Sequence, residues 1–290
     1  MNSSHEELTS GKLFDVTDLV VVITGGGTGI GQMMTRAMMA NGARKVYIVG
    51  RRLDVLQTTA NEFSSSSSSG KGTIVPIQAD LSKKSEVDGL RKKLEAEEKF
   101  IDLLINNSAI GGPEFDGNVQ TVEEISSSMW SADEGAARAL LETNILGYFY
   151  TSAGLLNLLG KSPNHPQIIN ISSNASFGRQ AMVGILYSCS KAAITHLTKI
   201  LATHLAHTHV RVNAIAPGLF PSELTAGDSD SKNRSELKDT MGLKIPEGRA
   251  GIDKEIACTV LYLASKNQQY TSGSVILADG GVLNLMPSSY

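Results

Sequence analysis

The sequence predicts an α/β fold with one doubly wound, seven-stranded parallel sheet flanked by helices. Short runs rich in Val and Ile alternate with longer segments of helical periodicity from residue 17 onward. Most of the short runs are nearly continuously apolar, which is typical of parallel strands covered on both faces. The 290 residues, 41% hydrophobic and 19% charged, provide enough apolar side chains for one large core and exclude a mainly disordered chain.

Seven segments are the expected strands, in chain order. They span residues 19–23, 45–49, 73–77, 103–105, 167–171, 210–215 and 274–277. Pro76 counts against the third segment, because proline prefers sheet edges or strand ends. We expect residues 1–16 to form a polar N-terminal extension and residues 17–290 to form a single domain. The run from Ser64 to Ser69 predicts a flexible surface loop.

Two longer stretches without regular patterning follow expected strands. Residues 111–135 follow the fourth strand and residues 219–248 follow the sixth. Both leave carboxyl ends of strands, where open α/β sheets bind their ligands. The second stretch is long and polar, so we predict that residues 219–248 form a mobile lid over the substrate.

Composition excludes several classes of protein. A net charge of −3 gives no electrostatic reason to expect a nucleic-acid or membrane partner. Cys189 and Cys258 are too few for a disulfide scaffold or a cysteine-rich zinc site. We expect His204, His207 and His209 to lie at a solvated helix end, so no metal is predicted. No export signal and no apolar run of roughly 18 residues is present, which favours a cytoplasmic location.

A glycine cluster follows the first expected strand directly and leads into a helical segment. Its candidate ligand-binding residues are Gly25, Thr28, Gly29, Ile30 and Gly31. Glycines let the backbone turn sharply and approach a pyrophosphate, whose charge meets the helix N-terminus. Gly31 would let the helix pack close to the strand. The strand–turn–helix context predicts that residues 17–290 are a Rossmann-type dinucleotide-binding and catalytic domain.

Tyr187 and Lys191 carry the clearest chemical signal. Residues four apart on a helix share one face, so both side chains would point into one pocket. A phenol with a pKa of ~10 is a poor acid–base catalyst at neutral pH, and a nearby ammonium lowers that pKa. We therefore expect Lys191 to bring the pKa of Tyr187 close to neutrality. Cys189, between them at an intermediate angle, is expected to be buried.

The T-G-x-x-x-G-x-G turn followed by Tyr-x-x-x-Lys resembles the short-chain dehydrogenase/reductase family over roughly residues 17–285. The resemblance implies a catalytic tetrad of Asn144, Ser173, Tyr187 and Lys191. Ser173 would hold a carbonyl oxygen near the phenol, and Asn144 would hold a water beside Lys191. The interval from Ser173 to Tyr187 is one residue longer than is usual in the family, which leaves Ser172 or a shifted loop as alternatives.

The end of the second strand sets the expected cofactor. NAD-specific members of this family carry an acid there, whereas this chain has Gly50 followed by Arg51 and Arg52. Guanidinium groups bind a 2′-phosphate through charge-assisted hydrogen bonds, so NADP(H) is the predicted cofactor; the alternative is two solvated surface charges. The resemblance also assigns other residues to the cofactor site: Asp80 and Leu81, Asn107 in a modified Asn-Asn-Ser-Ala motif, Tyr187, Lys191, Pro217, Gly218, Phe220 and Ser222. Lys191 would bind the nicotinamide ribose hydroxyls.

These residues together predict NADPH-dependent reduction of a ketone to a secondary alcohol, with Tyr187 as general acid. Residues 220–225 look similar to β-ketoacyl reductases, so a small-molecule β-ketoacyl or polyketide-like ketone is the first substrate to try. One alternative is a reductase-derived enzyme with a non-redox biosynthetic role. Another is a non-catalytic NADPH sensor, and the intact tetrad argues against this second alternative. The apolar pattern over residues 192–205 indicates core or a subunit interface, and the family resemblance favours a homodimer or homotetramer.

Overall fold

The computed structural model describes residues 4–66, 72–181 and 183–290. Their seven strands form one parallel sheet in the order β3-β2-β1-β4-β5-β6-β7, as predicted. The strands are β1 (Val20–Thr24), β2 (Lys45–Gly50), β3 (Thr73–Gln78), β4 (Leu103–Asn106), β5 (Gln167–Ile171), β6 (Arg211–Pro217) and β7 (Val275–Ala278). Pro76 lies in β3, which is an edge strand, so its missing N–H is tolerated.

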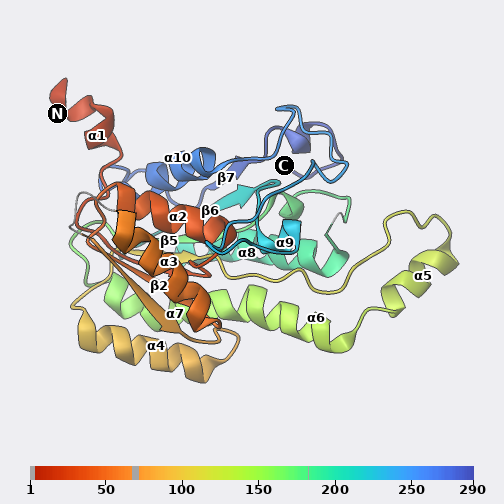
Figure 1. Ribbon diagram of the computed structural model, residues 1–290, viewed down its shortest axis with the longest axis horizontal. Helices are drawn as coiled ribbons and strands as arrows, with labels where there is room; N and C mark the ends of the chain where they lie inside the picture. Colours follow the sequence, from red (N-terminus) through yellow and green to blue (C-terminus); the bar gives the residue numbers. More distant parts are fainter. Residues whose placement is uncertain (1–3, 67–71, 182) are drawn as a thin grey trace.

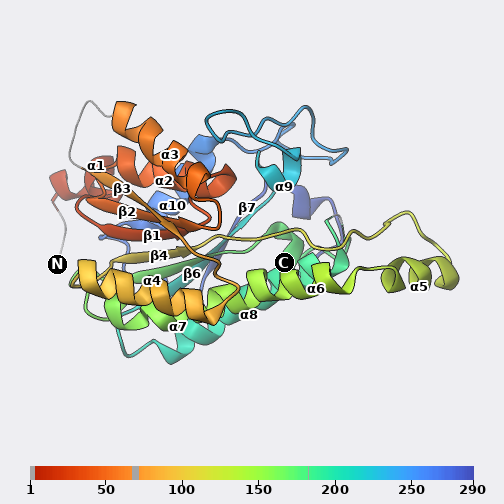
Figure 2. The same cartoon turned by 60° about the horizontal axis from the view of Figure 1, so that its bottom comes forward.

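Helices cover both faces of the sheet (Figures 1 and 2). One layer contains α2 (Gly29–Ala40), α3 (Leu53–Ser66) and α10 (Asp253–Ala264), and the other contains α4 (Lys84–Glu97), α7 (Gly147–Leu159) and α8 (Ile185–His204). Side chains of β1 alternate between the layers: Val21 and Ile23 pack with α2, whereas Val20 and Val22 pack with α4 and α7. Burial on both faces explains why the strands have continuously apolar sequences.

Residues 111–135 are not irregular throughout, contrary to the sequence-based expectation. They contain α5 (Val122–Trp130) and the start of α6 (Glu134–Leu141). Thr121 and Glu124 form a capping box at the start of α5, and the Asp133 side chain caps α6. None of the α5 residues is buried, and the helix extends away from the sheet (Figures 1 and 2). A π-helical segment, Glu142–Leu146, connects α6 to α7.

The remaining described segments contain short helices and turns. Residues 219–248 contain one short helix, α9 (Glu223–Ala226). The N-terminal extension contains a 3₁₀ turn (Glu6–Leu8) and α1 (Ser10–Leu13), and 3₁₀ turns also occur at Asn174–Ser176 and Val282–Asn284. The predicted serine loop is wrong in its first half, because α3 continues to Ser66; its remainder lies outside the described residues.

Candidate active site

A cavity of about 930 Å³ lies at the carboxyl ends of the strands, where the strand order reverses between β1 and β4. Every residue that the sequence assigned to catalysis or to the cofactor lines this cavity, with the exception of Asn144. The lining therefore includes Gly25, Thr28, Gly29, Ile30, Gly31, Arg51, Arg52, Asp80, Leu81, Asn107, Ser173, Tyr187, Lys191, Pro217, Gly218, Phe220 and Ser222. The volume and the position at the switch point suit a large ligand.

The turn between β1 and α2 is packed so tightly that it requires glycine. Gly25 and Gly29 have φ angles of +65° and +50°, in the left-handed region that favours glycine. A Cβ atom at Gly31 would lie 2.0 Å from the Gly25 carbonyl oxygen. Helix α2 starts at Gly29, so its N-terminal N–H groups and the positive end of its dipole face the cavity, which makes this turn suited to an anion.

The loop after β4 is hydrogen-bonded to this turn through Asn107. The Asn107 amide donates to the carbonyl oxygens of Thr24 at 3.0 Å and Gly25 at 3.2 Å. The Thr24 hydroxyl oxygen accepts from the backbone N–H groups of Asn107 and Ser108, at 2.8 and 3.0 Å. The modified Asn-Asn-Ser-Ala motif therefore still connects the ends of the two central strands.

The two arginines after β2 differ in their contacts. The Arg52 guanidinium forms a bidentate ion pair with Glu223, with N···O distances of 2.5 and 3.2 Å. This pair lowers the pKa of Glu223 and raises that of Arg52. The Arg51 guanidinium lines the cavity and has no side-chain partner among the residues that the structure describes. The sequence did not identify Glu223, because its proximity to Arg52 arises only from the fold.

Asp80, after β3, has its carboxylate occupied locally. The carboxylate accepts hydrogen bonds from the Ser82 N–H at 3.2 Å and the Ser82 hydroxyl at 2.7 Å, and it lies 3.4 Å from the Lys83 ammonium. Burial raises the pKa of Asp80, but these contacts outweigh burial and hold the pKa below its usual value. The group is therefore an anion at neutral pH that organises the turn beside the cavity.

Tyr187 and Lys191 lie one turn apart on α8, and both side chains are buried. The Lys191 ammonium donates to the carbonyl oxygen of Ile171 at 2.9 Å and to the Tyr148 hydroxyl at 3.4 Å. Its Nζ atom lies 5.8 Å from the centroid of the Tyr187 ring. The helix begins after Gly184, which has a φ angle of +139° and packs against Pro113. The chain thus holds the phenol and the ammonium on one wall of the cavity.

The expectation that Lys191 lowers the pKa of Tyr187 is wrong for this structure. Burial raises the pKa of Tyr187 to about 12, and a hydrogen bond from Ser173 opposes this only in part. Burial also lowers the pKa of Lys191 to about 7, because its partners are neutral oxygens and no carboxylate among the described residues pairs with it. The phenol therefore keeps its proton at neutral pH, while the amine is close to half protonated.

The two serines after β5 have different partners. The Ser172 hydroxyl donates to the carbonyl oxygen of Lys191 at 3.0 Å and lies 2.7 Å from the Thr195 hydroxyl, so it holds α8 against the sheet. The Ser173 hydroxyl accepts from the Ala175 N–H at 3.1 Å and is hydrogen-bonded to the Tyr187 phenol. Of the two serines, Ser173 is the one whose hydroxyl faces the phenol.

Asn144 lies behind the cavity wall, in the π-helical segment. Its side-chain oxygen accepts from the Ile110 N–H at 2.9 Å, and its amide nitrogen donates to the Ile110 carbonyl at 3.0 Å and to the Ser190 hydroxyl at 3.1 Å. Ser190 in turn donates to the carbonyl oxygen of Tyr187 at 2.7 Å. Asn144 therefore connects the loop after β4 to the helix that carries the phenol.

Other predicted residues lie away from the site. Cys189 is exposed on α8, so the prediction that it is buried is wrong: the helix turns its Tyr187 and Lys191 face inward and its Cys189 face outward. His204, His207 and His209 are exposed around the end of α8. Within the described ranges, no group of three or more His, Cys, Asp or Glu side chains could hold a metal ion.

Several cavity residues were not identified from the sequence. They come from the two long stretches after β4 and β6 and from the segment before α8: Glu114, Phe115, Val183, Glu223, Leu224, Met241 and Leu243. The one available signal was position, since both long stretches leave carboxyl ends of strands. Which side chains turn inward depends on tertiary packing.

Comparison with known proteins agrees with this geometry. The sequence profile of the short chain dehydrogenase family matches residues 19–233. The chain belongs to this family. As a short-chain dehydrogenase it is an oxidoreductase by family. In the part of the chain that the structure describes, no helix has the length and hydropathy needed to cross a membrane.

Three similar proteins illustrate the relationship of this short-chain dehydrogenase to others. The short-chain dehydrogenase/reductase PhomF of Diaporthe leptostromiformis is 38% identical over 297 residues, which cover 100% of this chain and 99% of PhomF. The rhamnolipids biosynthesis 3-oxoacyl-[acyl-carrier-protein] reductase of Pseudomonas aeruginosa is 31% identical over 271 residues, which cover 92% of this chain and 97% of that reductase. The solved Pseudomonas aeruginosa RhlG/NADP active-site complex is 30% identical and superposes with a TM-score of 0.78. The match covers 93% of this chain and 98% of the chain in that structure.

Proposed function

We propose that this short-chain dehydrogenase reduces a ketone to a secondary alcohol with NADPH. The observation that carries the proposal is that Ser173, Tyr187 and Lys191 line the same cavity as the glycine turn and Arg51. The similarity to a solved NADP complex and to a 3-oxoacyl reductase supports both the cofactor and the direction of reaction.

The residues of the cavity suit a dinucleotide. The backbone from Thr28 to Gly31 would hold the pyrophosphate, because a Cβ at Gly31 would fill the cradle and the α2 N-terminus offers free N–H groups. Arg51 would bind the 2′-phosphate. Asp80, Leu81 and Asn107 would flank the adenosine half, and Pro217, Gly218, Phe220 and Ser222 the nicotinamide half. When bound, NADPH supplies the hydride that reaches the carbonyl carbon.

Tyr187 is the proposed proton donor to the carbonyl oxygen. Its raised pKa, about 12, keeps the phenol protonated at neutral pH, so the proton is available as negative charge develops on the substrate oxygen. Ser173 would donate a hydrogen bond to the same oxygen and hold it beside the phenol. Lys191, with a pKa of about 7, can gain or lose a proton near neutral pH and so can return one toward Tyr187.

Asn144 is proposed as a positioning residue. Its amide joins the Ile110 backbone to Ser190, and Ser190 joins the backbone of Tyr187. Loss of this amide would release both the loop after β4 and the first turns of α8. The expected result is a lower kcat without a change in cofactor identity.

The substrate is proposed to be a β-ketoacyl or polyketide-like ketone. Apolar side chains of Phe115, Val183, Leu224, Met241 and Leu243 line the cavity and suit the hydrocarbon part of such a molecule. The name of the similar 3-oxoacyl reductase supports the same class. A homodimer or homotetramer is also proposed, because Phe149 on α7 and Ile200 on α8 leave large apolar side chains exposed. Size-exclusion chromatography with light scattering tests the assembly.

The decisive experiment follows NADPH absorbance across a panel of β-ketoacyl thioesters, diketones and cyclic ketones. Tyr187→Phe should lower kcat by at least about a hundredfold, the low end for a lost proton donor, while NADPH still binds. Tyr150→Phe is the matched control, because Tyr150 lies on α7 and does not line the cavity. Full activity of Tyr187→Phe would contradict the acid assignment.

A second variant tests the cofactor. Arg51→Asp should weaken NADPH binding far more than NADH binding, because a carboxylate repels the 2′-phosphate that only NADPH carries. An equal loss of affinity for both dinucleotides would show that Arg51 does not bind the 2′-phosphate.

A further inference from the structure

Residues 222–234, here called the strap, begin in the wall of the cavity, which Ser222 and Glu223 line, and are held at both ends. At the near end, Ser222 packs on the glycine turn: a Cβ at Gly29 would lie 2.8 Å from the Ser222 Cβ. At the far end, the buried Asn233 side chain donates to the Val55 carbonyl at 2.9 Å and to the Thr59 hydroxyl at 3.0 Å. The strap is therefore attached to α2 and α3 rather than free in solvent.

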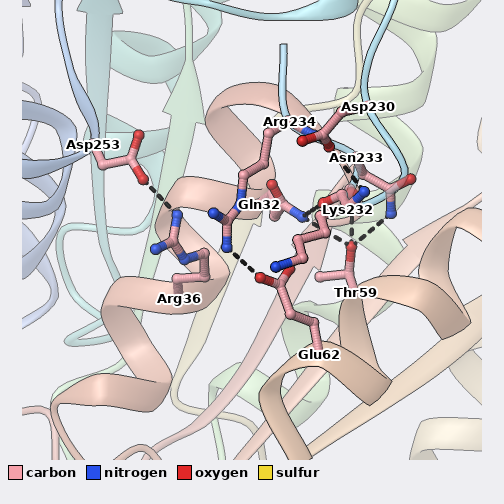
Figure 3. Close-up of polar contacts among 10 residues, drawn as sticks. Gln32, Arg36, Thr59, Glu62, Asp230, Lys232, Asn233, Arg234 and Asp253 are labelled. Carbon is pink, nitrogen blue, oxygen red and sulfur yellow. Dashed lines mark hydrogen bonds and ion pairs between the residues drawn. The ribbon is translucent and has the colours of Figure 1, made fainter. Parts of the chain in front are cut away.

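Further polar contacts fix the far end of the strap (Figure 3). The Gln32 amide donates to the Lys232 carbonyl at 2.7 Å, and Arg234 forms an ion pair with Glu62. Asp230 accepts from the N–H groups of Lys232 and Arg234 at 2.8 and 2.9 Å, which shapes the turn. The predicted lid, residues 219–248, is thus attached to α2 and α3 part-way along its length.

The Thr59 hydroxyl connects this anchor to the glycine turn. It donates to the carbonyl oxygen of Gly27 at 2.8 Å and accepts from Asn233. The position of the strap is consequently tied to the same turn that would hold the pyrophosphate.

Glu223 lies between the two attached ends and faces the arginines. Its carboxylate accepts both hydrogen bonds from Arg52, and the Ser229 hydroxyl donates to the same carboxylate at 3.0 Å. Asp54 adds a weaker electrostatic attraction on Arg52. Because the strap is fixed at both ends, the carboxylate stays within reach of Arg52, while Arg51 keeps a free guanidinium among the described residues.

We propose that Glu223 is a specificity-determining residue that competes with the 2′-phosphate of the cofactor for Arg52; this rests on the proposed NADP function. A phosphate at the end of β2 would meet one available guanidinium, Arg51, and one already neutralised by Glu223. For Arg52 to bind the phosphate alongside Arg51, it must exchange its carboxylate partner for the phosphate, whereas NADH leaves the ion pair intact. Glu223 therefore reduces the preference for NADPH over NADH.

Calorimetric titration of NADPH and NADH into the full chain tests this proposal. Glu223→Gln keeps the size of the side chain but removes its charge. It should tighten NADPH binding by about two- to fivefold, the effect of one exposed ion pair on an equilibrium, and leave the Kd for NADH unchanged. Glu134→Gln is the matched control: it also removes a carboxylate from an exposed arginine pair, with Arg138 on α6, outside the cavity.

The same substitution in an Arg52→Gln background shows whether the effect acts through Arg52. If Arg52 is the shared partner, Glu223→Gln should then change NADPH binding less than twofold. Weaker or unchanged NADPH binding by the single Glu223→Gln variant would overturn the proposal. An equal change in the Kd for NADPH and for NADH would also overturn it, because it would indicate that the substitution loosens the strap. A wild-type chain that binds neither dinucleotide would instead overturn the proposed function itself.

Discussion

Gly31→Ala tests how tightly the glycine turn is closed. The added Cβ would lie 2.0 Å from the Gly25 carbonyl oxygen and 2.6 Å from the Asn107 amide nitrogen. The first of these atoms belongs to the backbone, so no side-chain rotation relieves the clash and α2 must move outward. Overpacking costs about 1–3 kcal/mol, and a double clash with backbone involvement favours the upper half of that range. Alanine's better helix propensity returns at most about 1 kcal/mol.

The assay pairs urea unfolding with NADPH titration. Gly31→Ala should unfold at lower urea concentration and lose NADPH affinity by at least about tenfold, which is 1.4 kcal/mol, because the cradle for the pyrophosphate is displaced. Gly89→Ala is the control: Gly89 lies on α4 with no atom within 4 Å of its added Cβ. That change should stabilise the chain by about 0.5–1 kcal/mol. Wild-type stability and wild-type affinity of Gly31→Ala would refute the tight turn.

Three further predictions follow from buried or isolated side chains. The pKa of Lys191 is lowered to about 7, so between pH 7 and about pH 10 the unfolded chain binds a proton that the folded chain lacks, and the free energy of unfolding rises with pH. Lys191→Met should not show this rise when urea unfolding is measured at pH 7 and pH 9. An equal rise in the wild-type protein and the variant would contradict the prediction. Asp102→Asn should lower the free energy of unfolding by about 1–3 kcal/mol in the same assay. The buried carboxylate accepts hydrogen bonds from the Val20 N–H at 2.7 Å and the Ser162 hydroxyl at 2.5 Å. A smaller loss would show that these hydrogen bonds are weak. Trp130, the one tryptophan, is 91% exposed, so acrylamide should quench its fluorescence about as efficiently as that of a free indole; protection would indicate that α5 is covered.

The sheet could be predicted from the sequence because the burial of each strand is reflected in the apolar residues of that strand alone. A strand buried on both faces, such as β1, is apolar at nearly every position, and the glycine turn after it has its own spacing. Helix α5 could not be predicted in the same way. It packs on no core, so it has no buried stripe, and its one clear signal was the capping pair Thr121 and Glu124.

Within the candidate site, the sequence could indicate residue types but not their partners. Arg51 and Arg52 are adjacent and chemically identical in the chain, yet only Arg52 meets Glu223, which the strap brings back from far along the sequence. Ser172 and Ser173 are likewise distinguished by the direction each hydroxyl takes. These differences arise from tertiary packing and have no counterpart in local spacing.

The charges of Tyr187 and Lys191, the proposed catalytic pair, also depend on tertiary packing, and this has a chemical consequence. Lys191 is surrounded by the Ile171 carbonyl and the Tyr148 hydroxyl, neither of which compensates a buried ammonium. Its pKa therefore falls, and a lysine that is about half protonated at neutral pH stabilises the Tyr187 phenolate less than a permanent ammonium would. The proposed reduction needs a protonated phenol and is favoured by this state, whereas the reverse reaction, alcohol oxidation, would need a phenolate. The two directions of reaction should accordingly have different pH dependences, with oxidation requiring the higher pH.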